Sequence, residues 1–308
     1  MDLWRSGYSA LGNWMTEFAP GVPTETDWSQ SVVGSWYVPP SQHGLELICL
    51  SLVFALGTTY YGLAAFGPGL NRKLLFNFAP TRKASLVERT LFAALVISLA
   101  TTYIHKLIRG TTLFMLQPCH MSAILLVLVM SWPDKSSPIP HVLFNIYLHT
   151  YWGTIAALLF PDLRDHYLIG ETFNFFAGEF FATSWSDGRL NRNTHSLAIE
   201  HIIILILPFY MVYSGRYLVL PASSKVAMFA FMLYGLYHSP LIHVVALKST
   251  ININYIFTPP PIGFLIELGV LYRPFLYFVA MANMFISRYV LMGTALFLLP
   301  RRRHAKAD

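Results

Sequence analysis

Seven apolar stretches, each about long enough to cross a bilayer, run through most of this chain. They cover residues 44–66, 87–108, 111–131, 139–160, 197–220, 226–247 and 275–299. A helix needs about 20 apolar residues to cross the hydrocarbon core, and it satisfies its backbone hydrogen bonds internally. The pattern predicts an all-α fold: a polytopic transmembrane helical bundle of about seven spans.

The composition supports a membrane protein and argues against a soluble one. Charged side chains make up 12% of the 308 residues, and apolar ones make up 55%. Soluble globular domains carry about 25% charged residues. The basic excess, formally +6 at pH 7, is scattered between the apolar stretches. It therefore indicates membrane topology and gives no basic face for nucleic acid.

The basic residues mark one side of the membrane. They lie after the first, third and fifth stretches and in the tail: Arg72, Lys73, Arg82, Lys83, Lys135, Arg216, Lys225, Arg301, Arg302, Arg303 and Lys306. Short cytosolic loops are enriched in Lys and Arg. We therefore expect a lumenal or outside N-terminus and a cytosolic C-terminus.

The same pattern divides the chain into a leader, one transmembrane domain and a tail. Residues 1–43 form a polar and aromatic N-terminal leader, residues 44–300 the transmembrane helical domain, and residues 301–308 a basic cytosolic tail. The tryptophans of the leader are expected at the membrane interface, where such rings gather. They are Trp4, Trp14, Trp28 and Trp36.

Two segments fall outside the spans. Residues 161–196 form a long lumenal loop, which we expect either to lie on the membrane surface or to cover a site. The apolar stretch Ile262–Tyr272 is too short to cross and has prolines on both sides. We expect it to be re-entrant or interfacial.

Ionisable groups inside spans are costly and are candidates for function. The candidates are Cys119, His120, His149, Glu200, His201, His238 and His243. Others lie near the ends of spans, where long side chains reach the interface and bind solvent. We expect this behaviour of Glu46, Glu88, His105, Lys106 and His141.

Cys119 follows Pro118 in the third stretch. Because proline has no N–H, the carbonyl of Phe114 loses its helical partner, and we expect a kink. A kink beside a thiol exposes backbone groups and opens a pocket. The alternative is an inert cysteine, since a buried Cys usually behaves as a small hydrophobic residue.

His201 opens the fifth stretch. A lone membrane histidine is often only a structural hydrogen-bonding group. In the expected topology, Cys119 lies roughly 12 Å and His201 roughly 6 Å inside the lumenal end of the bundle. An imidazole within reach of a thiol can take its proton and form a reactive thiolate. We therefore predict Cys119 and His201 as a catalytic nucleophile and base.

The remaining histidines do not indicate a metal site. His238 and His243 are five residues apart, which places their rings about 140° apart on a regular helix. Helical zinc pairs use a spacing of four, and no such motif occurs. We expect no metal and no cofactor. The chain has two cysteines, so it has no disulfide framework.

Asn252 and Asn254 lie in a polar loop that ends in prolines. Asn side chains commonly bond their own backbone in such turns. Alternatively, their amides could act as donors at the lumenal mouth, toward a lipid headgroup or an oxyanion. The sequence leaves both readings open.

Taken in order, these residues resemble the transmembrane protein 164 family. The resemblance covers about residues 40–300 and rests on Gln117–His120, Glu200–His201, Tyr237–His238, Asn252–Pro260 and Tyr272–Arg273. It implies an acyltransferase that builds polyunsaturated, notably arachidonoyl, ether phosphatidylethanolamine, with a link to ferroptosis. The essential cysteine and histidine of the family fall on Cys119 and His201.

We therefore expect a phospholipid acyltransferase of the endoplasmic reticulum or another endomembrane. Cys119 would carry the acyl chain as a thioester to a lysophospholipid. Candidates for substrate binding or oxyanion stabilisation are Gln117, His120, His238, Asn252, Asn254 and Arg273. The alternatives are a lipid hydrolase with the same pair and a non-enzymatic seven-span receptor or carrier. Repeat symmetry or paired intramembrane charges would favour a carrier, and the sequence shows neither. It indicates no oligomeric state.

Overall fold

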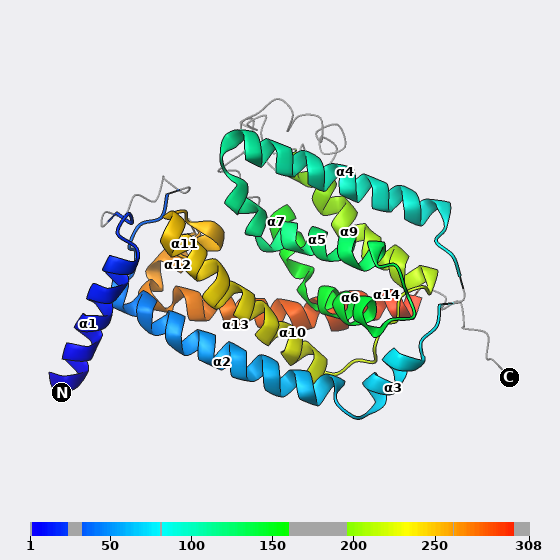
Figure 1. Ribbon diagram of the computed structural model, residues 1–308, viewed down its shortest axis with the longest axis horizontal. Coiled ribbons are helices and arrows are strands. Elements are labelled where there is room, and N and C mark those ends of the chain that lie inside the picture. Colours follow the sequence, from blue (N-terminus) through cyan, green and yellow to red (C-terminus); the bar gives the residue numbers. More distant parts are fainter. Residues whose placement is uncertain (1, 24–32, 81, 160–195, 261, 299–308) are drawn as a thin grey trace. The chain divides into compact units, whose positions relative to one another are not determined.

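The computed structural model describes residues 2–23, 33–80, 82–159, 196–260 and 262–298 (Figure 1). The predicted loop 161–196, apart from its last residue, the tail 301–308 and Trp28 lie outside these ranges, as does the side chain of Glu200. The all-α prediction is confirmed for the described residues. They contain helices and one isolated bridge, between Val33 and Ile251.

The helices coincide with the predicted stretches in part, and the fourth stretch, 139–160, is divided at Tyr151 into two helices. In chain order they are α1 Asp2–Phe18, α2 Pro40–Phe66, α3 Leu70–Asn77, α4 Leu86–Arg109, η1 Thr112–Leu116, α5 Pro118–Ser131, α6 Pro138–Thr150, α7 Trp152–Leu159, α9 Ser196–Ser214, α10 Ser224–Leu236, η3 Tyr237–Ile242, α11 His243–Ser249, η4 Ile253–Tyr255, α12 Gly263–Glu267, η5 Gly269–Leu271, α13 Tyr272–Phe285, η6 Ile286–Leu291 and α14 Met292–Leu298. They form two compact units. Unit 1 comprises residues 1–64 and 228–282, and unit 2 comprises residues 65–227 and 283–308.

Among the described residues, 4 helices are long and apolar enough to cross a membrane. They are Pro40–Phe66, Leu86–Arg109, Ser224–Ser249 and Gly269–Leu298. Two shorter apolar helices, Pro118–Ser131 and His201–Ser214, coincide with the third and fifth predicted spans. The transmembrane character is therefore supported, while the count of seven and the orientation stay predictions.

Lipid-facing surface is most evident on α2 and α4. Leu56 and Leu63 are each 71% exposed on α2, and Ile97 is 66% exposed on α4. Large aliphatic side chains at such exposure suit hydrocarbon and would be unfavourable in water.

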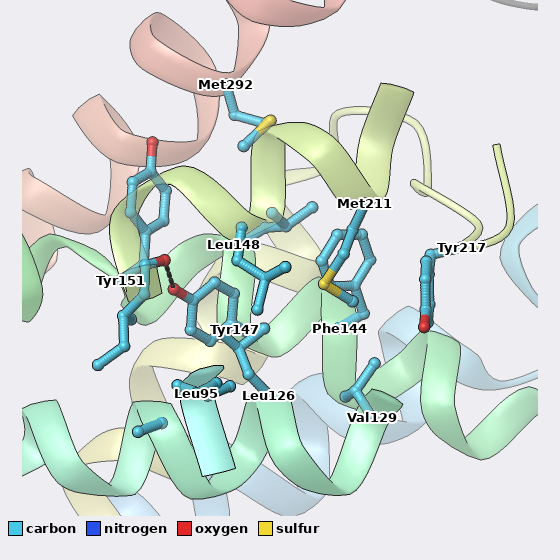
Figure 2. Close-up of a cluster of buried hydrophobic side chains, with 13 residues drawn as sticks. Leu95, Leu126, Val129, Phe144, Tyr147, Leu148, Tyr151, Met211, Tyr217 and Met292 are labelled. Carbon is cyan, nitrogen blue, oxygen red and sulfur yellow. Dashed lines mark hydrogen bonds between the residues drawn. The ribbon is translucent and has the colours of Figure 1, made fainter. Parts of the chain in front are cut away.

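Unit 2 has a core built from α4, α5, α6, α9 and α14 (Figure 2). Tyr147 lies fully buried there and donates its hydroxyl to the carbonyl of Ile204, at 2.6 Å. That carbonyl needs an outside donor, because its helical partner would be residue 208, which is a proline. The hydroxyl of Tyr147 thus replaces the backbone N–H that Pro208 lacks in α9.

The third predicted span is broken rather than kinked, which corrects the sequence prediction. Gly110 ends α4 in a left-handed conformation, the short η1 follows, and Gln117 is extended. Pro118 is then the first residue of α5, where its missing N–H costs nothing. The carbonyl of Phe114 accepts instead from the N–H of Gln117, at 3.0 Å.

The fifth predicted span is also shorter than expected. Helix α9 ends at Ser214 instead of residue 220, and an extended segment leads to α10. Side chains of other helices form hydrogen bonds with the backbone groups of this extended segment. Asn145 bonds Leu218 and Leu220 at 2.8 and 2.9 Å, and Arg288 donates to the carbonyl of Leu220 at 2.7 Å. Irregular backbone at membrane depth is tolerated when it is buried in protein and bonded in this way.

In unit 1, most of the first part of the leader is helical, as α1. Trp4 and Trp14 are exposed on α1, in keeping with an interfacial place, but Trp36 is buried. Its ring packs edge-on against His43 and Phe257. Trp36 therefore does not present its ring to lipid headgroups, and its depth in the membrane stays a prediction. Helix α2 begins at Pro40, four residues before the predicted start of the first span.

The stretch Ile262–Tyr272 folds into the short turns α12 and η5. It is too short to cross by itself, as predicted. The last span begins earlier than expected, at residue 269, and Pro274 lies within the first turn of α13. Proline is tolerated there because first-turn N–H groups have no helical acceptor. As a result, Arg273 stands at the start of a long helix.

Candidate active site

Cys119 and His201 stand near the N-terminal ends of two helices of unit 2. Cys119 is the second residue of α5, and His201 lies in the second turn of α9. The two helices pack against each other, and α7 packs against both. Figure 1 shows α5 and α9 running in the same general direction. Both side chains are buried, with Cys119 8% and His201 0% exposed. An apolar, water-poor setting thus surrounds a thiol and an imidazole on packed helices.

The break before α5 fixes what surrounds the thiol. Gln117 precedes the helix and is half-buried, while His120 is 2% exposed. At the start of a helix, N–H groups point out of its N-terminal end. Gly153 of α7 lies beside this end, because a Cβ on it would lie 3.9 Å from the Cβ of Pro118. The amides of Cys119 and His120 therefore belong to the helix end that carries the thiol.

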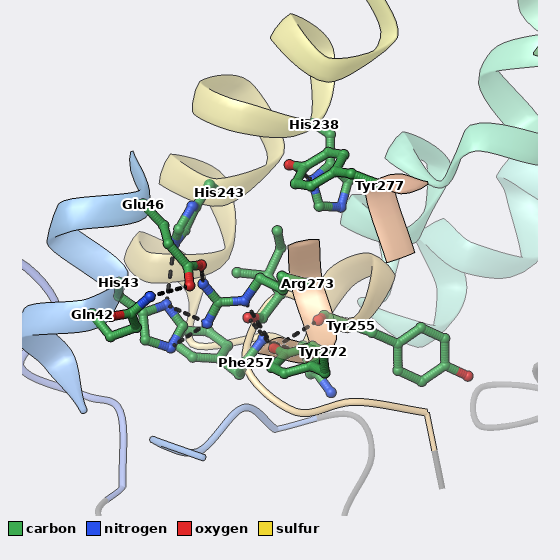
Figure 3. A network of polar contacts seen from close by, with 12 residues as sticks. Gln42, His43, Glu46, His238, His243, Tyr255, Phe257, Tyr272, Arg273 and Tyr277 are labelled. Carbon is green, nitrogen blue, oxygen red and sulfur yellow. Dashed lines mark hydrogen bonds and ion pairs between the residues drawn. The ribbon is translucent and has the colours of Figure 1, made fainter. Parts of the chain in front are cut away.

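In unit 1, Arg273 lies at the centre of a polar network (Figure 3). Its guanidinium forms an ion pair with Glu46 and bonds His43 at 2.9 Å and the hydroxyl of Tyr272 at 2.9 Å. His43 in turn bonds His243, at 3.1 Å. All of these side chains are buried. Arg273, predicted as a substrate-binding residue, is thus occupied by protein partners.

Two members of this network contradict or extend the sequence analysis. Glu46 was expected near solvent, but it is 7% exposed because it compensates Arg273. His43 was not singled out at all. Its spacing of three from Glu46 places both on one face of α2, and that spacing could have indicated a shared role.

His238 and His243 do not face a common metal. His238 bonds the hydroxyl of Tyr277 at 2.6 Å, whereas His243 bonds His43. Among the residues that the structure describes, no group of three potential ligands could hold a metal ion. The expected angle assumed a regular helix, whereas residues 237–242 form a π-helical turn with a non-helical Ser239.

The geometry of the 252–258 loop favours turn chemistry over oxyanion binding. The side-chain oxygen of Asn252 accepts from the N–H of Phe257 and of Thr258, at 2.9 and 3.3 Å, and its amide donates to the hydroxyl of Thr258. Asn254 has a φ of 48°, in the left-handed region that Asn tolerates better than most residues. Asn252 therefore closes the loop. These bonds direct its side-chain amide at Thr258 and not at a ligand.

A second polar cluster of unit 2 joins the start of α4 to the links after α5 and α9. Glu88 forms an ion pair with Arg216 and accepts from the hydroxyl of Tyr217 at 2.8 Å. Lys135 donates to the carbonyl of Met130 at 3.0 Å. Burial, followed by the charge of Arg216, lowers the pKa of Lys135 to about 8. Burial and the neighbouring Glu88 raise the pKa of Tyr217 above its ordinary value.

The expectation of solvent contact near the ends of spans is wrong for three residues of unit 2. Glu88, Lys106 and His141 are buried. Lys106 lies over the ring of Phe114, and His141 bonds the carbonyl of Lys135 at 2.8 Å. His105, in contrast, is half-exposed. Of the three buried residues, His141 satisfies backbone groups, since its other ring nitrogen accepts from the N–H of Leu218 at 3.2 Å.

The predicted site residues thus fall into two groups. Gln117, Cys119, His120 and His201 belong to unit 2, and His238, Asn252, Asn254 and Arg273 belong to unit 1. Within unit 2 the thiol and imidazole lie on packed helices. Within unit 1 Arg273, His238 and Asn252 all bond other groups of the protein. Among these candidates, a thiol and an imidazole occur together only in unit 2.

Two comparisons with known proteins indicate the same family. A family model described as the TMEM164 family matches residues 39–185, a range that contains Gln117, Cys119 and His120 and ends before His201. A protein of Dictyostelium discoideum named Transmembrane protein 164 homolog is 29% identical over 231 residues, which cover 74% of each chain. No solved structure matches the chain.

Proposed function

The chain is similar to the transmembrane protein 164 family, whose model matches residues 39–185, and on that premise we propose that it is a membrane-embedded phospholipid acyltransferase. Cys119 is the nucleophile and His201 the base. The observation that supports this is the burial of both groups near the N-terminal ends of α5 and α9, two helices that pack against each other. The family resemblance points to the same two residues.

The proposed reaction has two balanced steps. The sulfur of Cys119 bonds to the acyl carbon of a donor phospholipid as the ester C–O bond breaks, and the thiol proton passes through His201 to the departing lysophospholipid oxygen. His201 then takes the hydroxyl proton of an acceptor lysophospholipid. The acceptor oxygen bonds to the acyl carbon as the C–S bond breaks, and His201 returns the proton to the sulfur of Cys119. A covalent intermediate divides one difficult transfer into two easier ones.

The start of α5 supplies a plausible site for the oxyanion. Amides in the first turn of a helix, here those of Cys119 and His120, point outward and favour developing negative charge. Asn252 is a poor candidate for this role, because its amide already donates to Thr258. Backbone amides also hold their position without side-chain ordering.

The substrate follows from the family and from the setting. We propose that a polyunsaturated acyl chain, such as arachidonoyl, moves onto an ether phosphatidylethanolamine lysolipid in the endoplasmic reticulum or another endomembrane. An acyltransferase in the bilayer can receive both lipids laterally. The link to ferroptosis follows, since polyunsaturated ether lipids peroxidise readily.

The test is acyl transfer by the full chain reconstituted in phosphatidylcholine vesicles with a labelled lysophosphatidylethanolamine acceptor. Cys119→Ala should abolish transfer. The matched control is Cys49→Ala, because Cys49 is the other cysteine of the chain and lies exposed on α2. It should leave transfer unchanged. Full activity in Cys119→Ala would refute the mechanism.

Product analysis separates the remaining possibilities. Free fatty acid without new phospholipid would make the protein a hydrolase that uses the same pair. If neither product forms and an activity-based thiol probe fails to label Cys119, a receptor or carrier becomes the better account. The acyltransferase should label at Cys119 and lose the label in His201→Ala.

A further inference from the structure

Three arginines of the described chain are largely or fully buried, and only two of them have an acidic partner. Arg216 pairs with Glu88, and Arg273 pairs with Glu46. Arg288, which is 3% exposed, contacts no carboxylate among the residues that the structure describes. A guanidinium cannot lose its proton in a protein, so burial alone does not neutralise it. An uncompensated buried ion costs several kcal/mol.

The contacts of Arg288 leave part of its hydrogen-bonding capacity unused. One terminal nitrogen donates to the carbonyl of Leu220 at 2.7 Å, and the guanidinium lies 5.9 Å from the ring centre of Tyr289. The Nε atom is buried and has no hydrogen-bond partner. A carbonyl and a ring provide partial charges only, so they do not balance a full positive charge.

A second unused polar atom belongs to the same neighbourhood. His149 is 1% exposed, and its Nδ1 bonds the carbonyl of Asn145 at 2.7 Å. Its Nε2 is buried without a partner. The ring lies 6.1 Å from that of Tyr289, and Arg288 is close enough to interact electrostatically with it. Since Nδ1 is fixed on a carbonyl, Nε2 is the atom that remains for a ligand.

The local backbone is also unusual. Ile286–Leu291, which carries Arg288, is a π-helical turn between α13 and α14. Such turns occur frequently at functional sites. The hydroxyl of Tyr289 donates a hydrogen bond to the carbonyl of Ser223, at 2.8 Å. Ser223 follows Pro221 and Ala222, which are both exposed. Tyr289 therefore ties this π-helical turn to a segment that is exposed at Pro221 and Ala222.

We propose that Arg288 and His149 form a binding site for a phosphate group. The ligand is a phosphate ester: either the headgroup phosphate of a glycerophospholipid or free inorganic phosphate, which presents the same oxygens. Arginine binds such oxygens through paired N–H donors. Because Nδ1 of His149 donates to a carbonyl, Nε2 of the neutral ring is an acceptor, which suits a protonated phosphate oxygen or the ammonium of an ethanolamine headgroup. This proposal does not depend on the chemistry of Cys119.

The experiment measures the thermal unfolding midpoint of the delipidated full chain in a nonionic detergent. Three probes are added separately: dioleoyl phosphatidylethanolamine, dioleoylglycerol and sodium phosphate. The phospholipid should raise the midpoint by about 4 °C, as expected for a ligand near saturation. Dioleoylglycerol, which lacks phosphate, should not. If sodium phosphate also raises the midpoint, free phosphate is sufficient for binding. If sodium phosphate does not raise it while the phospholipid does, the site requires the phosphate of a lipid headgroup.

The variants make the result specific to Arg288. Arg288→Gln should lose the response, Arg288→Lys should weaken it, and the exposed control Arg89→Gln should respond like the parent. Cys119→Ala should also respond fully, which separates this site from the acyl-transfer chemistry. An equal response in Arg288→Gln, or an equal rise with dioleoylglycerol, would overturn the proposal.

The unfolding midpoints of the variants without lipid provide an independent check. Arg288→Gln removes a charge that has no acidic partner among the described residues, but it also removes the bond to the carbonyl of Leu220, so it should lower the midpoint only slightly. Arg216→Gln should lower it more, because that change leaves Glu88 buried and uncompensated. If Arg288→Gln is destabilised as strongly as Arg216→Gln, or fails to fold, then protein groups already compensate Arg288 and the phosphate site does not exist.

Discussion

The polar interiors of the two units are organised differently. In unit 1, buried polar side chains bond mainly to one another, as Arg273 does with Glu46 and His43. In unit 2 they bond mainly to backbone, as Tyr147 does with Ile204 and Asn145 with Leu220. The Asn252 loop of unit 1 is an exception, because its side chain bonds backbone amides.

Both units contain short helices and breaks, so helix length alone does not explain the difference. In unit 2, the breaks before α5, after α9 and at Pro208 leave amides and carbonyls that lipid cannot satisfy. Apart from the Glu88–Arg216 pair, polar side chains of unit 2 mainly serve such groups, while the Arg273 network of unit 1 balances charge. The comparison predicts how each unit responds to substitution.

The largest effect is expected for Arg273→Gln in unit 1. It leaves Glu46 buried without its counter-ion, which should lower the free energy of unfolding by about 3–5 kcal/mol. Unfolding in mixed micelles with increasing SDS measures this. The double variant Glu46→Gln/Arg273→Gln should recover part of the loss. A single-variant loss below about 1 kcal/mol would mean that the pair is not the main support of the network.

Asn145→Ala should be the most damaging neutral substitution considered in unit 2. It removes bonds to the carbonyl of Leu218 and the N–H of Leu220, and both groups lie in the extended segment after α9. Buried unsatisfied groups cost about 1–3 kcal/mol each, so a loss of about 2–3 kcal/mol is expected. Thr150→Ala is a matched control on the same helix, since its hydroxyl bonds only carbonyls of α6. An equal loss in both would contradict the account.

Tyr147→Phe should cost about 1–2 kcal/mol, because the carbonyl of Ile204 loses its donor. The cause can be isolated with Pro208→Ala, which restores the helical N–H. In that background, Tyr147→Phe should cost clearly less. If the cost is the same with and without Pro208, the hydroxyl does not compensate the proline.

The smallest effect concerns Lys135. Its pKa is lowered to about 8 in the folded chain, so the unfolded chain binds more protons between about pH 8 and 10.5. Stability should therefore rise with pH across that interval, by no more than about 1 kcal/mol after solvent screening. The raised pKa of Tyr217 acts in the opposite direction at higher pH, so measurements should stay between about pH 7.5 and 9.5. Lys135→Met should flatten the profile, and an unchanged slope would exclude Lys135 as its source.

Hydropathy was sufficient to predict the helical membrane architecture, because burial in lipid demands long apolar helices. The family resemblance is also confirmed. Where helices end was harder to predict. The break at Pro118 depends on the extended Gln117, and the end of α9 at Ser214 depends on Asn145 and Arg288, which are distant in sequence. The preference of a residue before proline for extended backbone was the available signal at Gln117.

The candidate site shows the same limit. Cys119 and His201 stand out locally as polar residues within apolar runs, and both are buried. Arg273 was a candidate only for substrate binding or oxyanion stabilisation, and its ion pair joins residues far apart in the chain, which no local pattern indicates. Intramembrane ionisable residues are therefore good candidates for function only once their partners are known.

The most direct test of the central claim is to trap the acyl group on the enzyme. The full chain is incubated with arachidonoyl phosphatidylcholine without acceptor, and the peptide containing Cys119 is analysed by mass spectrometry. The account predicts a hydroxylamine-labile arachidonoyl group on Cys119, strongly reduced in His201→Ala and absent in Cys119→Ala. An active preparation in which Cys119 never carries an acyl group would contradict it.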